Sequence, residues 1–379
     1  MNIEVKNSKD VYVIATGTID TNAASFFDEQ INLVRAKNPD KKIYIDFTKV
    51  KMITSACIRC LLKFKKNNYN FELIGVNKEV YTVLKLTGMN EILNLEQETI
   101  SVNIEGCKLL GKGFHSEVYQ INDETIAKIY YDLPDIDMLI NERIIAQQAF
   151  VKGVPTEISF GMCESNGRPG LVYELVDADT LLSIFVDDET KMEELVPQYV
   201  DIVKKMHRFD SNGIIAIPDT KEILQKDIDT IRNYLQDDYC VKLQNLLDNI
   251  PNSNHLLHGD AHPGNVMLTN KGMVFIDLSD MRTGDEIFDL VYLHRTLIQF
   301  NKIAGNTYAL KQEQAAKLYR LFFDEYYKDE TEDRKRELDS KIYLLSLISI
   351  TARFLRKNPN DEESIRMLNE LKEITIKRD

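Results

Sequence analysis

Three polar residues, Asp260, Asn265 and Asp277, lie in the stretch Leu256–Leu278, which otherwise consists mainly of apolar and small residues. Apolar runs that read as short strands flank the loop 258–264, and Asp277 ends the next strand. Transfer of a phosphoryl group from a nucleotide needs such a set: a base that orients the attacking hydroxyl, then an amide and an acid that hold Mg²⁺ on the phosphates. The alternative is a polar turn between two strands.

The loop has the form His-Gly-Asp-x-His-x-x-Asn, and the spacing from Asp260 to Asn265 equals that of the protein-kinase catalytic loop. It resembles the aminoglycoside phosphotransferase and choline kinase branch of the kinase-like fold. The resemblance implies that Asp260 is the catalytic base and that Asn265 and Asp277 bind the metal. It also implies that His258 supports the loop, while His262 either contacts a phosphate or shapes the turn.

A glycine pair, Gly111 and Gly113, lies between two strand patterns upstream of this loop. Glycine lets the backbone approach phosphates closely, and the segment resembles a kinase glycine-rich loop. An ordinary hairpin turn is the alternative interpretation. The strand 125–130 follows, with Lys128 among apolar residues. Lys128 matches the lysine that contacts the α- and β-phosphates in kinases, although a surface lysine on an edge strand would have the same pattern.

Glu142 is the only acidic residue of the helical pattern Met138–Val151. The resemblance makes it the partner that holds Lys128 against the phosphates. A solvated helix face is the alternative. The strand Leu171–Asp177 resembles the segment that links the two kinase lobes and meets adenine through its backbone. Its position alone predicts nucleotide contacts from Glu174 to Val176.

From residue 180 onward the pattern is mostly helical, with one long helix predicted over Lys221–Leu247. His207 falls where related enzymes have a packing histidine, so we expect a structural role. Asp280 matches the second acid that commonly ends this family's motif, and we expect it to take part in metal or substrate binding. Asp289 is expected to cap or anchor the start of the helix that follows it.

Residues 1 to about 100 alternate strand and helix patterns, which predicts a small mixed sheet with helices packed on it. We expect Thr21 or Asn22 to cap the first helix, a helix over Lys78–Thr87 and a short last strand over Ile92–Leu95. The segment Asp46–Ser55 entering a helix resembles the STAS domain of anti-sigma-factor antagonists. In that family the serine matched by Ser55 is phosphorylated as a partner-binding switch; a simple helix N-cap is the alternative.

The composition, 44% hydrophobic and 28% charged residues, is that of a soluble globular protein. No apolar run approaches the ~18 residues that a membrane span requires, and no secretory signal is present, so we expect a cytoplasmic protein without membrane contact. The net charge of −13 argues against a nucleic-acid partner. It would suit a cationic substrate, but solubility explains it equally well. The Cys57-x-x-Cys60 pair is better explained by buried thiols than by a redox or zinc site.

Together the patterns and the two resemblances imply an α/β STAS-like domain at 1–100, followed by a two-lobed α+β kinase-like fold with an N-lobe at 101–177 and a mostly helical C-lobe at 178–379. The resemblance implies a phosphotransferase that uses ATP, with GTP left open, and Mg²⁺ to phosphorylate a hydroxyl of a small molecule. The STAS-like domain would regulate it or bind a protein partner. The alternatives are a nucleotide-sensing binding protein and a protein serine kinase that acts on the STAS serine.

Overall fold

A computed structural model describes residues 1–7, 10–67, 69–76, 80–81, 83–84, 87, 89–93, 100–113, 115–131, 136–214, 217–304 and 309–376. The chain divides into two compact units, Met1–Val176 and Asp177–Asp379. Each unit is described in turn.

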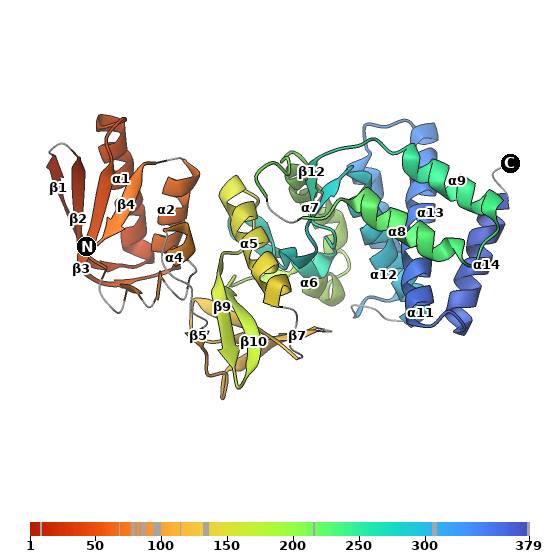
Figure 1. The fold of residues 1–379 in the computed structure, drawn as a ribbon, viewed down its shortest axis with the longest axis horizontal. Helices are drawn as coiled ribbons and strands as arrows, with labels where there is room; N and C mark the ends of the chain where they lie inside the picture. Colours follow the sequence, from red (N-terminus) through yellow and green to blue (C-terminus); the bar gives the residue numbers. More distant parts are fainter. Residues whose placement is uncertain are drawn as a thin grey trace. The chain divides into compact units, whose positions relative to one another are not determined.

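The first unit begins with a four-stranded sheet in the order β1-β2-β3-β4, in which β1 is antiparallel to β2 and the other neighbours are parallel (Figure 1). Its strands are β1 (Asn2–Asn7), β2 (Val11–Ile19), β3 (Ile43–Ile53) and β4 (Phe71–Ile74). Helix α1 (Thr21–Lys37) connects β2 to β3, and α2 (Ser55–Lys66) connects β3 to β4. Parallel neighbours need such crossovers. The predicted mixed sheet with packed helices is confirmed.

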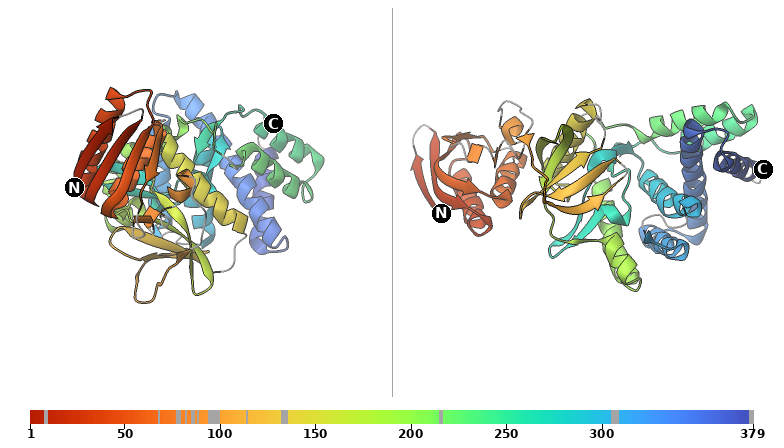
Figure 2. Two further views of the ribbon diagram at one scale, coloured as in Figure 1. Left: turned by 60° about the vertical axis from the view of Figure 1, so that its left-hand side comes forward. Right: turned by 90° about the horizontal axis from the view of Figure 1, so that it is seen from below.

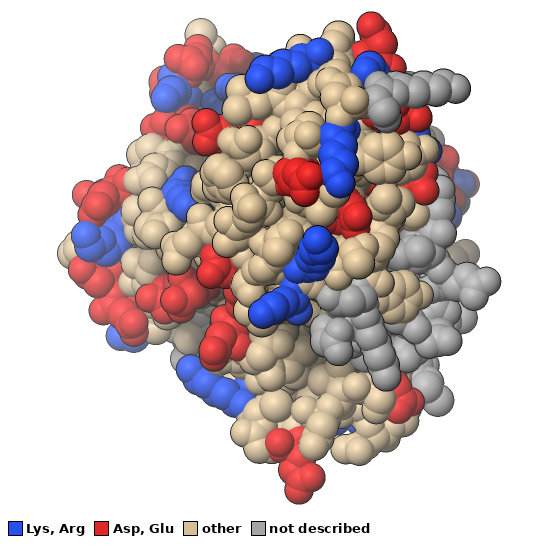
Figure 3. All heavy atoms as spheres, turned by 90° about the vertical axis from the view of Figure 1, so that its left-hand side faces the viewer, with Lys and Arg blue, Asp and Glu red and all other residues tan. Residues whose placement is uncertain are grey.

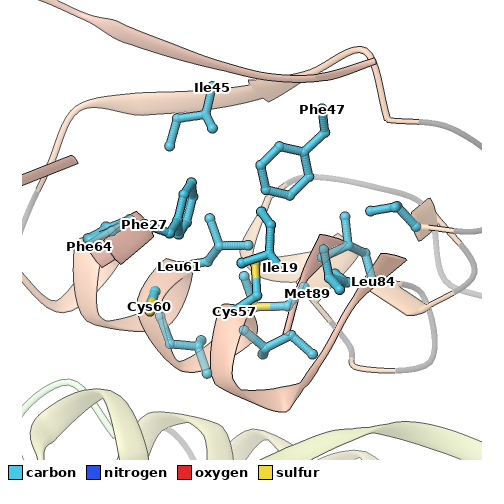
Figure 4. Close-up of a cluster of buried hydrophobic side chains, with 14 of the residues drawn as sticks. Ile19, Phe27, Ile45, Phe47, Cys57, Cys60, Leu61, Phe64, Leu84 and Met89 are labelled. Atoms are coloured by element: carbon cyan, nitrogen blue, oxygen red, sulfur yellow. The ribbon is translucent and has the colours of Figure 1, made fainter. Parts of the chain in front are cut away.

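The core of this sheet and its two helices is aromatic and aliphatic, as Figure 4 shows. Phe27 of α1 is fully buried, with its ring centroid 6.0 Å from that of Phe47 and 5.9 Å from that of Phe64. Cys57 and Cys60 of α2 are buried in the same cluster, and both are free thiols. Burial raises the pKa of Cys60 to about 11, and that of Cys57 rises as well. The thiols therefore stay protonated and pack as small apolar groups.

Two local predictions in this domain are wrong. The carboxylate of Asp20, not Thr21 or Asn22, caps α1, because it accepts the N–H of Ala23 at 2.8 Å. Ile92 ends the short helix α4 (Met89–Ile92) instead of beginning a strand. Met89 is fully buried, and so short an apolar run does not distinguish a strand from a buried helical turn. Residues 78, 79, 82, 85 and 86 of the predicted helix Lys78–Thr87 lie outside the described residues, as do Asn94 and Leu95, while residues 80–81 and 83–84 are helical as predicted.

The first unit continues with a six-stranded sheet in the order β5-β9-β10-β8-β7-β6, seen from two further directions in Figure 2. Its strands are β5 (Ile100–Ser101), β6 (Lys108–Lys112), β7 (Ser116–Gln120), β8 (Thr125–Tyr130), β9 (Ser159–Ser165) and β10 (Arg168–Glu174). All neighbours are antiparallel except β5 and β9. Helix α5 (Ile136–Lys152) packs against β9 and β10. We call this sheet and helix the N-lobe.

The second unit is mainly helical. Its helices are α6 (Leu181–Asp187), α7 (Lys191–His207), α8 (Thr220–Arg232), α9 (Asp237–Asp248), α10 (Ile287–His294), α11 (Asn301–Ala304), α12 (Gln312–Tyr326), α13 (Glu332–Lys357) and α14 (Glu362–Ile376). Short strands form two small sheets: β11 (Asp179–Thr180) with β13 (Val266–Thr269) and β14 (Gly272–Phe275), and β12 (His255–Leu257) with β15 (Arg282–Gly284). Within the described residues, no helix combines the length and apolar content that crossing a bilayer requires.

The single helix predicted over Lys221–Leu247 is wrong, because the chain breaks into α8 and α9. Asn233 ends α8, and Gln236 precedes the first turn of α9, which carries Asp237 and Asp238. Acidic residues favour a helix N-terminus, where they meet free N–H groups and the positive end of the helix dipole. These acidic residues therefore mark the start of a second helix, although the apolar residues of the whole segment follow one continuous helical pattern.

The surface of the protein mixes both signs of charge on the face drawn in Figure 3. In the first sheet and its helices, exposed ion pairs join Lys42 to Glu72 at 2.5 Å and Lys63 to Asp28 at 2.6 Å. Exposed pairs of this kind contribute about 1 kcal/mol or less. Stability of this domain therefore rests on its apolar core.

We expect Phe27→Ala to lower the free energy of unfolding by about 3–5 kcal/mol, because it removes a fully buried ring from between two others. The measurement is denaturant unfolding of the full chain followed by circular dichroism. Phe26→Ala is the matched control, since the neighbouring ring on the same helix is 43% exposed. Equal effects of the two substitutions would contradict this packing.

Candidate active site

In the N-lobe, Lys128 of β8 and Glu142 of α5 form an ion pair, with Lys128 Nζ 2.9 Å from Glu142 Oε1. The Glu142 side chain is only 4% exposed and that of Lys128 13%. A buried carboxylate needs a cation and hydrogen bonds to offset the loss of water. The pair joins the sheet to the helix and fixes where the ammonium group lies.

Two tyrosines that the sequence analysis missed complete the partners of Glu142. Tyr130 donates its hydroxyl to Oε2 at 2.5 Å, and Tyr173 donates to Oε1 at 2.9 Å. Tyr130 follows Lys128 by two positions on β8, so both side chains emerge on the same face of the strand. That spacing was a readable signal for Tyr130; Tyr173, on β10, could be found only from the sheet pairing.

The glycine pair lies at a hairpin. Gly111 is in β6, and Gly113 follows it and donates its N–H to the carbonyl oxygen of Ser116 at 2.8 Å. A Cβ atom built on Gly111 would meet nothing within 4 Å, so packing alone does not require glycine there. The expected approach to phosphates stays a prediction, and Phe114 lies outside the described residues.

Glu174, at the end of β10, is already engaged by the protein. Its N–H donates to the carbonyl oxygen of Ile158 at 2.9 Å, and that of Leu175 donates to the carbonyl oxygen of Glu124 at 2.8 Å. Backbone contacts to adenine would therefore come from carbonyl groups of this segment or from Val176. Their role stays a prediction.

Ser55 is the first residue of α2, and Thr54 occupies the N-cap position without a side-chain bond to the helix. The alternative interpretation of Ser55 as the N-cap is therefore wrong by one residue. The Ser55 N–H lies 3.4 Å from Oε2 of Glu124. Phosphorylation of this serine stays a prediction.

In the second unit, the loop after β12 is closed by the amide of Asn265. Its Nδ2 donates to the carbonyl oxygen of Asp260 at 2.9 Å, and its N–H donates to that of His262 at 2.9 Å. The turn Pro263–Asn265 then leads into β13. Because Nδ2 is used inside the loop, Oδ1 is the atom that Asn265 offers to a cation.

Asp277 follows β14 in a left-handed backbone conformation, with φ 56°. This conformation is uncommon outside glycine and often marks functional positions. Ile276 ties the residue to the loop, since its N–H donates to the carbonyl oxygen of Asn265 at 3.0 Å and its own carbonyl oxygen lies 3.3 Å from His258 Nε2. Ser279 Oγ donates to Asp277 Oδ1 at 2.7 Å. Asp260, Asn265 and Asp277 thus belong to one hydrogen-bonded assembly.

Asp289 holds the start of the loop, which differs from the predicted cap of its own helix. Its two carboxylate oxygens accept the N–H groups of His258 at 3.0 Å and Gly259 at 2.7 Å. His207 Nε2 lies 2.8 Å from the same carboxylate, and His207 Nδ1 lies 2.8 Å from the Tyr326 hydroxyl. Burial opposes ionisation, but the contacts with His207 outweigh it and keep the pKa of Asp289 below its usual value. The expected structural role of His207 agrees with this arrangement.

The surroundings of Asp260 and Asp289 shift the pKa values of the two carboxyl groups in opposite directions. Burial, with the nearby charges of Asp280 and Asp277, raises the pKa of Asp260 to about 6, while Arg295 acts in the opposite direction. A carboxyl group in this range exchanges protons near neutral pH.

His262 lies against the same carboxylate, with its Nε2 3.6 Å from Asp260 Oδ2. Its Nδ1 accepts the N–H of Gly264 at 3.0 Å, so the proton of the neutral ring is on Nε2. Burial lowers the pKa of His262 to about 4. The histidine therefore lies beside Asp260 as a neutral ring and adds no positive charge.

The donors present fit Mg²⁺. Asn265 Oδ1 and the Asp277 carboxylate are hard oxygen ligands, and Mg²⁺ is usually held by one or two carboxylates together with substrate phosphates. Among the described residues, no group of three or more His, Cys, Asp or Glu side chains could hold a metal ion by itself. This donor set suits a metal that arrives with a nucleotide.

Gly259 offers a test of the loop geometry. Its φ is +79°, and a Cβ atom there would overlap the carbonyl oxygen of Asp280. We expect Gly259→Ala to lower the free energy of unfolding by at least about 3 kcal/mol, measured by denaturant unfolding. Gly213→Ala is the matched control, because Gly213 has φ +81° with no atom within 4 Å; only the cost of the backbone conformation, about 1–2 kcal/mol, should appear. Similar losses of stability in both variants would show that the loop accommodates a Cβ atom at position 259 and would contradict the close contact with Asp280.

The raised pKa of Asp260 predicts a stability effect. Because the folded pKa of about 6 exceeds the unfolded value, the ionised carboxylate destabilises the fold above pH 6, and this penalty disappears as the pH falls toward about 4. The free energy of unfolding of Asp260→Asn should therefore exceed that of the wild type by about 2 kcal/mol at pH 8, and the two values should be nearly equal at pH 4.

Thermal and denaturant unfolding across this pH range measures the effect. Asp229→Asn removes a carboxylate that is 53% exposed on α8 and controls for the general effect of a lost charge. A wild type as stable as Asp260→Asn at pH 8 would contradict the assignment.

Comparison with known proteins bears on both units. Residues 106–317 match the model of the phosphotransferase enzyme family, APH, and residues 2–102 match the STAS domain. A search of curated protein sequences gave no match.

Among solved structures, the GDP and kanamycin complex of APH(2")-IIia has a TM-score of 0.51 at 18% sequence identity, with 71% of this chain and 93% of that chain covered. A choline/ethanolamine kinase family protein from Mesorhizobium loti gives a TM-score of 0.47 at 14% identity, with 71% and 87% covered. The first of these likenesses supports the kinase-like fold, in agreement with the predicted architecture. The chain belongs to the phosphotransferase enzyme family and carries a STAS domain at its N-terminus.

Proposed function

We propose that the protein is an ATP- and Mg²⁺-dependent phosphotransferase that moves the γ-phosphoryl group to a hydroxyl of a small molecule. The observation that carries the proposal is the assembly around Asp260, in which the Asn265 amide closes the loop and Ile276 ties Asp277 to it. A polar turn without chemistry does not need a left-handed aspartate or a partly buried carboxylate of raised pKa.

Asp260 would orient the acceptor hydroxyl and take its proton late in a loose transition state. Its pKa of about 6 keeps it largely ionised at neutral pH, as a base requires. His262 Nε2 beside its Oδ2 would help to fix the direction of the carboxylate. Asn265 and Asp277 would hold Mg²⁺, which when bound neutralises charge on the phosphates.

Lys128 would contact the α- and β-phosphates, held in place by Glu142 and its two tyrosines. This preorganisation matters because phosphoryl transfer depends mainly on positioning and charge stabilisation. Gly111 and Gly113 would cover the phosphates, and the segment Glu174–Val176 would meet the base of the nucleotide.

The acceptor is proposed only as a class. A solved structure of similar fold is a complex with GDP and kanamycin. We carry over from it a purine nucleotide as donor and a small molecule as acceptor. GTP stays open as the donor beside ATP.

We expect Asp260→Asn to abolish transfer to any acceptor while the affinity for Mg·ATP stays within about threefold of the wild type, because the base is lost and the nucleotide contacts remain. The measurements are isothermal titration with Mg·ATP and release of ADP in a panel of small alcohols, including aminoglycosides and choline. Asp333→Asn is the matched control, since its side chain is 89% exposed on α13. Turnover in Asp260→Asn would remove the proposed base, and a wild type that binds nucleotide without turnover across the panel would favour a nucleotide-sensing binding protein.

A further inference from the structure

Helix α2 of the STAS domain contacts the N-lobe through Arg59. Its guanidinium makes two parallel bonds to the carboxylate of Glu174, from Nε to Oε1 at 2.9 Å and from an Nη atom to Oε2. The Glu174 side chain is 12% exposed, so the pair is partly withdrawn from water. Paired bonds of this kind are among the strongest and most directional that side chains form.

The same guanidinium lies over the ring of Phe150, 5.7 Å from its centroid. Phe150 is in the last turns of α5, and α2 packs against that helix. Phe150 and Val151 of the N-lobe and Ala56 of α2 also border one shared apolar cluster. Arg59 therefore joins α2 to two N-lobe elements, the end of β10 and the end of α5.

The start of α2 makes a second contact of matching charge. The Ser55 N–H points to Oε2 of Glu124, 3.4 Å away, in the turn before β8. Free N–H groups and the positive end of a helix dipole favour a carboxylate at this place. The backbone of Glu124 in turn holds Leu175, whose N–H it accepts at 2.8 Å. Two carboxylates of the N-lobe thus meet one positive helix turn of the STAS domain.

These contacts fall on the elements that position the proposed nucleotide residues. Helix α5 carries Glu142, strand β8 carries Lys128, and Glu174 begins the segment assigned to the base. The ion pair between Lys128 and Glu142 is formed while α2 is docked. Docking is thus compatible with the arrangement that nucleotide binding would need.

We propose that the partner of the STAS domain is the N-lobe of its own chain, and that the Ser55–Arg59 turn of α2 docks there to hold α5 and the end of β10 in the nucleotide-binding arrangement. The effect on nucleotide rests on the proposed function; the docking itself does not. Docking would then increase the affinity for nucleotide, because helix α5 takes part both in docking and in the nucleotide site. A negative charge added at Ser55 lies beside Glu124 and opposes docking, which is how phosphorylation of this serine would act.

A charge-swap cycle on the full-length protein tests this. Arg59→Glu should weaken Mg·ATP binding at least about fivefold in isothermal titration, whereas Glu174→Arg and the double variant are judged by hydrogen exchange alone, because Glu174 begins the segment assigned to the nucleotide. Hydrogen exchange of the α5 amides should rise in each single variant and fall again in the double variant. Lys63→Glu is the matched control: it makes the same charge change on α2, but Lys63 pairs with Asp28 inside the STAS domain and should leave both readouts unchanged.

Single variants with wild-type exchange in α5 would overturn the docking, as would a double variant that restores nothing. Normal Mg·ATP affinity in an Arg59→Glu variant whose α5 exchange has risen would overturn the coupling. The failure of the proposed function is distinguishable, because a wild type that does not bind Mg·ATP still reports docking through the exchange of α5 and its restoration in the swap.

Discussion

The buried carboxylate of Asp289 is the constraint on which the proposed catalytic loop depends. It accepts the N–H groups of His258 and Gly259 and pairs with His207, so the backbone just before Asp260 has no freedom to turn. An ionised carboxylate in an apolar interior is costly unless its partners replace water. Removing any one partner would leave a buried charge or a buried donor unsatisfied. Other conformations of the loop would break these hydrogen bonds, and their higher free energy keeps the loop in place.

The N-lobe uses the same device around Glu142, whose oxygens receive Lys128, Tyr130 and Tyr173. In both places the hydrogen-bond partners of a buried carboxylate are all supplied by the protein. The carboxylate then holds a functional group in position, the loop before Asp260 or the ammonium group of Lys128, and takes no part in the proposed reaction. Asp260 contrasts with these two, because burial and the nearby acids Asp280 and Asp277 oppose its charge. Carboxylates in different environments can thereby take different roles: Asp289 and Glu142 are structural anchors, and Asp260 is the carboxylate that we propose as proton acceptor.

Backbone geometry and domain contacts add to this preorganisation. Gly259 and Asp277 both adopt left-handed backbone conformations. At position 259 the close carbonyl oxygen of Asp280 leaves no room for a side chain, and Asp277 directly precedes the turn that begins at Leu278. In the first unit, the contact of Arg59 with Glu174 joins the STAS domain to the sheet that carries Lys128. The STAS domain therefore contacts the sheet whose residues are proposed to bind the nucleotide.

The sequence by itself determined the fold class and the identity of the chemical groups. The mixed sheet follows from local periods in a single sequence. The kinase-like order of elements and the proposed set from Gly111 to Asp277 follow from short motifs that resemble those of a known family. Boundaries inside apolar periods were less secure, as the break between α8 and α9 shows, because two helix ends there compete with one continuous pattern.

Only the tertiary structure decided which buried groups serve as partners. Asp289 read as a helix cap, yet its donors come from a loop about 30 residues earlier and from His207 on α7. Tyr173 and the contact of Arg59 with Glu174 likewise join elements distant in sequence. A periodic pattern fixes the face on which a side chain emerges but not the group that it meets, since that depends on how separate elements pack.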